Sequence, residues 1–405
     1  MSPIAPIFFI HLPKSGGSSI MSFFELNAGK DAYAHCDWDT HDQAKTVDKL
    51  GSSGVGGGHQ PYGYHRISRT PLNYVTVLRD PLARQISHYW YARTGKNGEE
   101  FTSYSHAEAM VMAGKISLDT WVADSLDGGN LAVRMLSGMG KASKEALALA
   151  KENIDRRFLL AGQCEDISEF LLLLCGRTNL NLPFFSPTNI TNVGNVERVS
   201  VSDAAAEKFK AENALDYELY GYVRDILDRD VALLGSAFKT ALESVRQIQA
   251  RVDILENPLR FKATGAGFDA NHLSSVHSLV SGCDLRAINA FLQSARAVQR
   301  PRQHFYDGVV DEVNNDVIRG WAVNLGDPGR PVTVDVVSDG HIIESIVANQ
   351  KREDVAKAGY GSNSAGFSLP LTPAIAACAS FSVRYSGTTE FLRDGEGWRN
   401  GWHHA

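Results

Sequence analysis

A lysine, two glycines and three serines stand close together near the start of the chain, shortly after four apolar residues. The apolar run is Ile7–Ile10, and the polar stretch spans residues 14–19. A continuous apolar run with two aromatics is typical of a strand buried on both faces, so we expect a strand to end near His11. The glycines permit a tight turn, and Ser18 or Ser19 can cap a following helix. A lysine beside a helix N-terminus favours a bound phosphate group.

The order of these residues differs from that of nucleoside triphosphatase loops. In the pattern G-x-x-x-x-G-K-[ST], the lysine follows the glycines and stands beside the hydroxyl that holds magnesium. Here Lys14 precedes Gly16 and Gly17. The motif therefore does not indicate a kinase loop, although a nucleotide or sugar kinase on the same fold stays an alternative. An ordinary turn after a strand is the simplest competing interpretation.

A second motif, R-D-P-x-x-R-x-x-S-x-Y, begins at Arg79. The β-rich residues 74–78 precede it, Pro81 suits the first turn of a helix, and later apolar residues follow helical spacing. We therefore expect Arg79 at the carboxyl end of a strand and Ser87 about two turns into the helix. Guanidinium and hydroxyl groups both suit a phosphate. The competing interpretation is a helix capped by Asp80 beside an exposed arginine.

His59 ends a glycine-rich stretch that lies between the two motifs. Such a run of glycines marks backbone that bends or approaches another group closely. An imidazole, with an unperturbed pKa of about 6.5, suits a general base. A lone histidine is more often structural, and a nearby carboxylate stays an alternative as the base.

Together these motifs resemble those of sulfotransferases that use 3′-phosphoadenosine 5′-phosphosulfate (PAPS), in particular the carbohydrate, uronyl 2-O-sulfotransferase-like members. Residues 13–19 resemble the loop that holds the 5′-phosphosulfate, with Ser18 where threonine is common. Arg79 and Ser87 resemble the 3′-phosphate site, and Gly58 with His59 resembles the Gly-His that supplies the base. The resemblance covers roughly residues 5–230.

The resemblance implies transfer of a sulfuryl group from PAPS to a hydroxyl, most naturally one on a carbohydrate or polysaccharide. The catalytic residues would be Lys14, which stabilises the leaving oxygen, and His59, which takes the acceptor's proton. The cofactor-binding residues would be Lys14, Ser15, Gly16, Gly17, Ser18, Ser19, Arg79 and Ser87. No metal is required. Tyrosine, lipid and small-molecule acceptors stay open, and a non-catalytic nucleotide-binding scaffold is a further alternative.

The elements that must position these residues form an α/β domain, and the resemblance implies a P-loop-NTPase-like parallel sheet flanked by helices. We expect this sulfotransferase domain over residues 1–235 and a helical connector over residues 236–304. From residue 305 to residue 405, short apolar runs separated by turns predict an all-β sandwich. This accessory domain is similar to small β modules of bacterial glycan-modifying enzymes.

Length and composition agree with a globular protein of two or three domains. The chain has 405 residues, 43% hydrophobic and 21% charged, with a net charge of -6. This charge gives no general attraction to nucleic acid. The five cysteines lack C-x-x-C spacing and are read as reduced thiols. A homo-oligomer is compatible with these features.

Two further stretches support negative predictions. Residues 31–46 are rich in His and Asp, but their spacing fits no regular metal site, so we expect a solvated loop. The first six residues lack a basic region, and the apolar run after them is too short for a signal peptide or a membrane span. A cytoplasmic location is therefore the default expectation.

Overall fold

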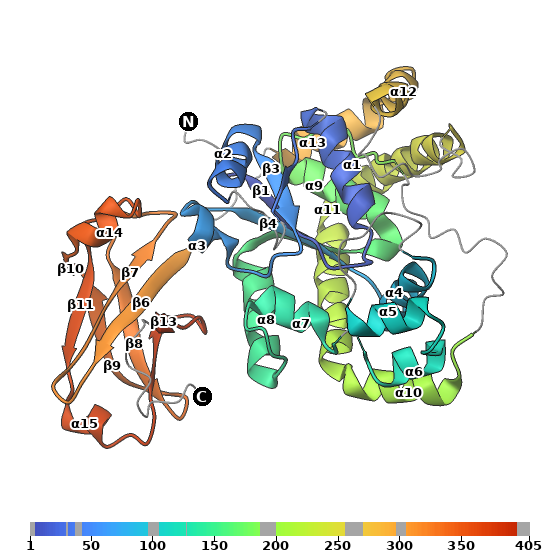
Figure 1. The fold of residues 1–405 in the computed structure, drawn as a ribbon. Coiled ribbons are helices and arrows are strands. Elements are labelled where there is room, and N and C mark those ends of the chain that lie inside the picture. Colours follow the sequence, from blue (N-terminus) through green and yellow to red (C-terminus); the bar gives the residue numbers. More distant parts are fainter. Residues whose placement is uncertain are drawn as a thin grey trace. The chain divides into compact units, whose positions relative to one another are not determined.

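Two compact units make up the chain in the computed structural model (Figure 1). The first unit comprises residues 1–62 and 73–300, and the second comprises residues 63–72 and 301–405. The predicted division at residues 235 and 305 stays a prediction. The structure describes residues 5–29, 31–36, 43–95, 105–126, 128–186, 200–255, 270–296 and 305–394.

Five parallel strands form the sheet of the first unit, in the order β2-β3-β1-β4-β5. β1 lies between β3 and β4, and its residues Phe8, Phe9 and Ile10 have no exposed surface. This central position explains the continuous apolar run in the sequence. The strands are β1 (Ile7–Ile10), β2 (Ala34–His35), β3 (Val55–Gly58), β4 (Asn73–Leu78) and β5 (Phe158–Gln163).

Helices flank this sheet, so the predicted α/β class is confirmed. Helices α2, α8, α9 and α11 contact its strands. The long helix α11 is interrupted at Gly235, whose backbone is not helical (φ 66°, ψ −151°). The helices of this unit are α1 (Gly17–Ala28), α2 (Gln43–Ser53), α4 (Pro81–Arg93), α5 (His106–Met112), α6 (Leu118–Ala123), α7 (Leu131–Ser137), α8 (Lys144–Arg156), the 3-10 helix η2 (Cys164–Asp166), α9 (Ile167–Arg177), α10 (Asp203–Glu212), α11 (Ala214–Leu255), α12 (Ala270–Ser281) and α13 (Arg286–Arg296).

The strand order creates a switch point at the carboxyl edge of the sheet. From β1 the chain runs through α1 to β2 and β3, on one side of β1, and then crosses to β4 and β5 on the other side. The connections that leave β1 and β4 therefore diverge. Ligands of open α/β sheets bind outside the carboxyl ends of strands at such a point.

Two local predictions from the sequence are corrected. Neither Ser18 nor Ser19 caps α1, because the helix already begins at Gly17 and its N-cap is Gly16, in a left-handed conformation. The stretch 31–46 is not one loop, because it contains β2 and the start of α2. Its residues 37–42 lie outside the described residues. Within the described ranges, no group of three His, Cys, Asp or Glu side chains could hold a metal.

The second unit contains two mainly antiparallel sheets, as predicted for the C-terminal region. Their orders are β10-β11-β7-β6-β13 and β12-β8-β9, and side chains from both sheets form one hydrophobic core. Residues 63–72, which join β3 to β4, also belong to this unit. Its elements are α3 (Tyr64–Ser68), β6 (Tyr306–Val313), β7 (Val317–Asn324), β8 (Val332–Ser338), β9 (His341–Ala348), β10 (Gln350–Lys351), α14 (Glu353–Lys357), β11 (Ser364–Pro370), α15 (Pro373–Ala376), β12 (Ser382–Tyr385) and β13 (Arg393–Asp394).

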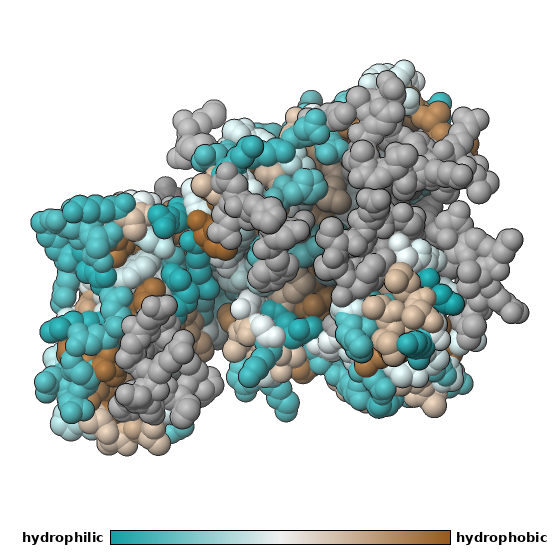
Figure 2. Space-filling model, viewed as in Figure 1, coloured by the Kyte–Doolittle hydropathy of each residue, from teal (hydrophilic) through white to brown (hydrophobic). Residues whose placement is uncertain are grey.

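Apolar side chains are concentrated in the two cores. On the face shown in Figure 2, hydrophilic residues predominate, and hydrophobic ones appear only in small separate patches. The large apolar side chains that are exposed include Leu233 and Ile254, both in α11, and Ile342 in β9. None of the described helices is both long and apolar enough to cross a membrane.

Candidate active site

The loops that follow β1 and β4 are tied together at the switch point. The Nη1 atom of Arg79 donates a hydrogen bond to the carbonyl oxygen of Lys14, at 3.1 Å. Arg79 directly follows β4, and Lys14 lies in the turn between β1 and α1. The sequence motifs that begin at residues 13 and 79 therefore meet in space.

The loop after β1 has the features of an anion site. Lys14 and Gly16 both have positive φ, 64° and 78°, which turns the chain tightly into α1. The N-cap Gly16 offers no side-chain acceptor, and the first turn of α1 contains no acidic residue. The hydroxyl of Ser15 is buried and has no hydrogen-bond partner among the described residues. A helix start of this kind favours a negatively charged group.

Helix α4 is held firmly beside this loop. The side chain of Asp80 caps it by accepting from the backbone N–H of Ala83 at 2.8 Å, and Pro81 occupies its first turn. The backbone N–H of Asp80 in turn donates to Glu165 Oε1, at 2.9 Å, just after β5. The predicted cap is confirmed, but Arg79 is partly buried and bonded to the loop, whereas the competing interpretation left it exposed.

One face of α4 is turned toward the loop. The ammonium group of Lys14 lies 3.7 Å from the centroid of the Tyr91 ring. Ser87 precedes Tyr91 by four residues, so both lie on the same side of the helix. Ser87 is partly buried. Arg79 thus contacts the loop, and Ser87 lies on the face of α4 that carries Tyr91.

His59 follows β3 and is held by the end of β1. Its Nδ1 atom lies 2.8 Å from the carbonyl oxygen of His11. Because a carbonyl oxygen can only accept, Nδ1 carries the proton, and in the neutral ring Nε2 keeps its lone pair. The rings of His11 and His59 are stacked, with centroids 4.3 Å apart. His59 therefore has the tautomer that a general base requires.

The sequence predicts that a strand ends near His11, but it assigns the His11 side chain no role. Its ring stacks on Phe9 on one side, with centroids 5.4 Å apart, and on His59 on the other. A Cβ atom at position 17 would overlap this ring, so a glycine is needed there. Burial, and next the positive charges of His59, Lys14 and His35, hold the pKa of His11 well below its usual value. Its position directly after a buried strand was the available signal.

A small void lies behind the loop. It measures about 10 Å³, which is about the space of one water, and it borders Ser15, Arg79, Arg84, Asp216 and Tyr220 among others. Asp216 is buried, and its carboxylate accepts hydrogen bonds from the backbone at the start of α7. Burial raises the pKa of Asp216, while these bonds oppose the rise. This region therefore supports the site rather than opening it to a ligand.

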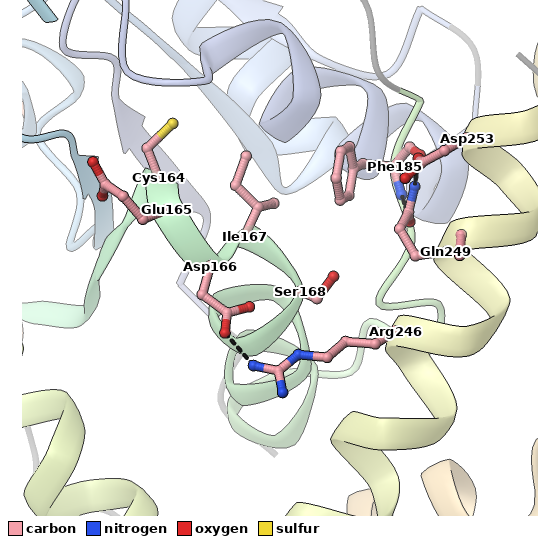
Figure 3. A pocket seen from close by; sticks show the side chains of 10 residues that line it. Cys164, Glu165, Asp166, Ile167, Ser168, Phe185, Arg246, Gln249 and Asp253 are labelled. Carbon is pink, nitrogen blue, oxygen red and sulfur yellow. Dashed lines mark hydrogen bonds and ion pairs between the residues drawn. The ribbon is translucent and has the colours of Figure 1, made fainter. Parts of the chain in front are cut away.

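A larger cavity of about 310 Å³ lies on the β5 side of the loop (Figure 3). One wall is the end of β5 with the start of α9, the other is α11, and Phe185 lies between them. Arg246 of α11 forms an ion pair with Asp166 across this cavity. A Cβ atom at Gly16 would lie 3.1 Å from the cavity residues Cys164 and Ile167, so the cavity adjoins the loop.

Burial perturbs the thiol of Cys164, which borders this cavity. Burial raises the pKa of its thiol to about 11, while the nearby charge of Arg79 opposes the rise. A thiol with such a pKa is almost entirely protonated near neutral pH, so Cys164 is no nucleophile here. The five cysteines are free thiols in the structure, as the sequence predicts.

The predicted site residues that follow β1, β3 and β4 thus lie at one edge of the sheet, whereas Ser87 lies in the second turn of α4. Lys14, Ser15, Gly16 and Gly17 form the turn into α1, and Ser18 and Ser19 lie in its first turn. Arg79 contacts the loop directly, and Ser87 shares the face of α4 that carries Tyr91. His59 is connected to the loop through His11. Tyr91 and the cavity on the β5 side were missed because they depend on packing between distant segments.

Two curated proteins are similar to part of this chain. Heparan-sulfate 6-O-sulfotransferase 2 of Gallus gallus is 25% identical over 179 residues, which are 38% of this chain and 43% of that protein. Heparan-sulfate 6-O-sulfotransferase 3 of Mus musculus is 22% identical over 182 residues, 38% of each protein. The match thus covers less than half of either relative. No protein-family model matches the chain. This distant similarity supports a relationship to sulfotransferases.

Proposed function

We propose that this protein is a PAPS-dependent sulfotransferase that acts on a hydroxyl of a carbohydrate. The observation that carries the proposal is the hydrogen bond between Arg79 and the Lys14 carbonyl, which unites the two phosphate motifs at the switch point. The similarity to two proteins named as heparan-sulfate sulfotransferases supports the same reaction class. The strand order β2-β3-β1-β4-β5 supports a P-loop-like fold.

The residues present fit the donor nucleotide. The unpartnered, buried hydroxyl of Ser15 and the uncapped start of α1 suit a 5′-phosphosulfate. Arg79, with Ser87 on the adjoining helix face, suits the 3′-phosphate. The cavity of about 310 Å³ beside Gly16 is large enough for a nucleoside, since ligand pockets start at about 300 Å³. Phe185 offers an apolar ring there.

When bound, PAPS supplies the sulfuryl group: the acceptor oxygen bonds to sulfur as the bond from sulfur to the bridging phosphate oxygen breaks. Lys14 is placed to stabilise negative charge at the loop, and it would leave the Tyr91 ring to do so. His59 accepts the acceptor's proton at Nε2, since Nδ1 is occupied by the His11 carbonyl. No step in this scheme needs a metal.

The position of transfer is the finer part of the proposal. The motifs resemble uronyl 2-O-sulfotransferases, whereas the similar proteins are named for 6-O transfer. Both names describe hydroxyls on a sulfated polysaccharide, so we propose a polysaccharide acceptor. Analysis of the sulfated product identifies which hydroxyl accepts the sulfuryl group. The second unit is proposed as an accessory module for this acceptor.

Calorimetric titration of the full chain tests the proposal. We expect 3′-phosphoadenosine 5′-phosphate to bind equally well with and without magnesium, and more tightly than ATP. Preference for ATP with magnesium would instead support the kinase alternative. Binding of the first nucleotide without transfer of labelled sulfate to any of a panel of glycans would support the scaffold alternative.

A further inference from the structure

His11 lies between the proposed base and the phosphate loop. Its backbone N–H donates to the Gly58 carbonyl at 2.9 Å, and its own carbonyl accepts from Nδ1 of His59 at 2.8 Å. The backbone of one residue thus fixes both the strand end that carries His59 and the tautomer of its ring. The side chain then adds a stacked ring, tilted by 28° from the His59 plane.

The far side of the His11 ring is also occupied. Phe9 stacks on it with an interplanar angle of 17°, so the three rings form a continuous column along the edge of β1 and β3. Gly17, the first residue of α1, packs so closely on the His11 imidazole that no side chain fits there. His11 therefore cannot move without disturbing both His59 and the start of α1.

The imidazole rings of His11 and His59 have different surroundings. Nε2 of His11 faces Gly17. The bond from Nδ1 of His59 to the His11 carbonyl places the lone pair of the neutral His59 ring on Nε2, at the edge of the sheet. Among the described residues, the charged and titratable groups that act on His11 are His59 after β3, Lys14 in the loop and His35 in β2, and none of them is an acid. None of these three groups favours a proton on His11.

We propose, on the basis of the proposed sulfotransferase function, that His11 is a positioning residue for His59: its ring supports the face of the base, and its packing on Gly17 keeps base and phosphate loop in register. The proton of the acceptor hydroxyl passes to Nε2 of His59, and His11 exchanges no proton during the reaction. Its low pKa agrees with this, because burial and the neighbouring positive charges keep the ring neutral.

Side-chain variants separate the supporting ring from its nitrogens. His11→Phe keeps an aromatic face, whereas His11→Ala removes it, and both keep the backbone carbonyl. We expect His11→Ala to lower kcat by about ten- to a hundredfold, because a slightly misplaced catalytic group costs that much. His11→Phe should restore kcat to within about threefold of the unchanged protein. His277→Ala is the control, since His277 is an exposed imidazole of α12, and kcat should not change.

Nitrogen-15 NMR of the histidine rings gives a readout that needs no turnover. We expect His59 in the unchanged protein and in His11→Phe to carry its proton on Nδ1. His11→Ala keeps the carbonyl that accepts this proton, but the His59 ring loses its stacked support and can turn away from the carbonyl, so His59 should show a mixture of tautomers. If His11→Ala destabilises the fold, His11→Gln and His11→Phe carry the comparison.

Two results would overturn the proposal. His11→Ala could leave both kcat and the His59 tautomer unchanged, or His11→Phe could lose as much activity as His11→Ala, which would show that a nitrogen is required. Failure of the sulfotransferase function itself would appear separately, as absence of 3′-phosphoadenosine 5′-phosphate binding by the unchanged protein with its His59 tautomer intact.

Discussion

At the scale of single residues, Lys14 carries the charge on which the proposed chemistry depends. Its backbone is left-handed, its carbonyl accepts from Arg79 and its ammonium rests on the Tyr91 ring. The side chain is therefore held near the loop, with its charge against an aromatic face. A cation on such a face is stabilised by only about 0.5–1 kcal/mol at a partly exposed site, so it can be released to a ligand.

We predict that Lys14→Ala lowers the rate of sulfate transfer by about a hundredfold or more, because loss of one group that stabilises developing charge typically costs this much. The melting temperature should change little, since the backbone bonds of residue 14 remain. Lys141→Ala, at an exposed position of the same unit, is the control. A folded Lys14→Ala protein with unchanged turnover would remove Lys14 from the mechanism.

Arg79 donates to the loop in the structure and is proposed to bind the 3′-phosphate, and a pair of ligands separates these two roles. As a ligand of the 3′-phosphate, it should contribute about 1.5–3 kcal/mol to binding, or about ten- to a hundredfold. As the donor to the Lys14 carbonyl, it also shapes the loop. We predict that Arg79→Ala weakens 3′-phosphoadenosine 5′-phosphate by about ten- to a hundredfold and adenosine 5′-phosphate by much less, measured by calorimetry. Equal losses for both ligands would assign Arg79 to the loop alone.

At the scale of elements, the sequence predicted what local patterns determine. The buried run Ile7–Ile10, the strand before Arg79 and the helix that starts at Pro81 were all predictable, because burial and capping leave signals in neighbouring residues. The strand β2 was missed because it has only two residues and stands in a polar stretch. The start of α1 was placed too late, since the positive φ of Gly16 replaces a side-chain cap.

The site itself was predictable only as a set of residues. Because the strands are parallel, residues that follow β1, β3 and β4 must meet at one edge, and the motifs named most of them. The stack of His11 on His59 depends on the order in which β3 and β1 pair, which no local pattern reveals. The cavity between α9 and α11 requires segments about 80 residues apart in the chain, as the ion pair between Asp166 and Arg246 shows.

The junction of β1 and α1 gives a prediction at this scale. Gly17→Ala places a methyl group where the His11 ring lies, and such overpacking costs about 1–3 kcal/mol. We predict lower stability in urea unfolding and weaker nucleotide binding, because the start of α1 must shift. The double variant with His11→Ala should recover part of the lost stability, since it removes the clashing ring. Strict additivity of the two changes would mean that residue 17 does not press on His11.

At the scale of the whole molecule, the second unit is completed by a segment from the middle of the first. Residues 63–72 join β3 to β4, yet they pack with residues 301–405. Arg66 forms an ion pair with Glu390, and Nε2 of His65 lies 3.2 Å from the carbonyl oxygen of Tyr306. Arg66 also lies 3.9 Å from Asp307, whose side chain has no exposed surface. The C-terminal region is therefore not an independent appendage.

We predict that Arg66→Ala destabilises the second unit by about 3 kcal/mol, because removing one partner of a buried ion pair leaves an uncompensated charge. The loss should fall at the lower end of the usual range, since Arg393 still pairs with Asp307 at 2.8 Å. Arg319→Ala is the control, because its ion pair with Glu312 is exposed and such pairs contribute at most about 1 kcal/mol. Calorimetric unfolding of the full chain measures both changes, and equal small losses would contradict the prediction.

Shortening the chain tests how far the second unit reaches into the reaction. A chain that ends at Arg296 keeps α13, which packs on α11 through Phe291 and Phe238, with ring centroids 5.3 Å apart. Residues 63–72 then lack the rest of their unit, residues 301–405. This segment starts four residues after His59. Lys14 and Arg79 are anchored directly after the central strands β1 and β4, and His59 is held at the end of β3 by the His11 carbonyl.

We predict that the shortened chain still binds 3′-phosphoadenosine 5′-phosphate within about threefold of the full chain's affinity. We expect kcat toward a small acceptor to fall by about tenfold or more, because the segment that follows His59 loses its packing partners and the ring is held less precisely. Calorimetry and a labelled-sulfate assay measure the two quantities on the same preparation. Full turnover by the shortened chain would show that residues 63–72 do not influence the base, and the second unit would then act only on long acceptors.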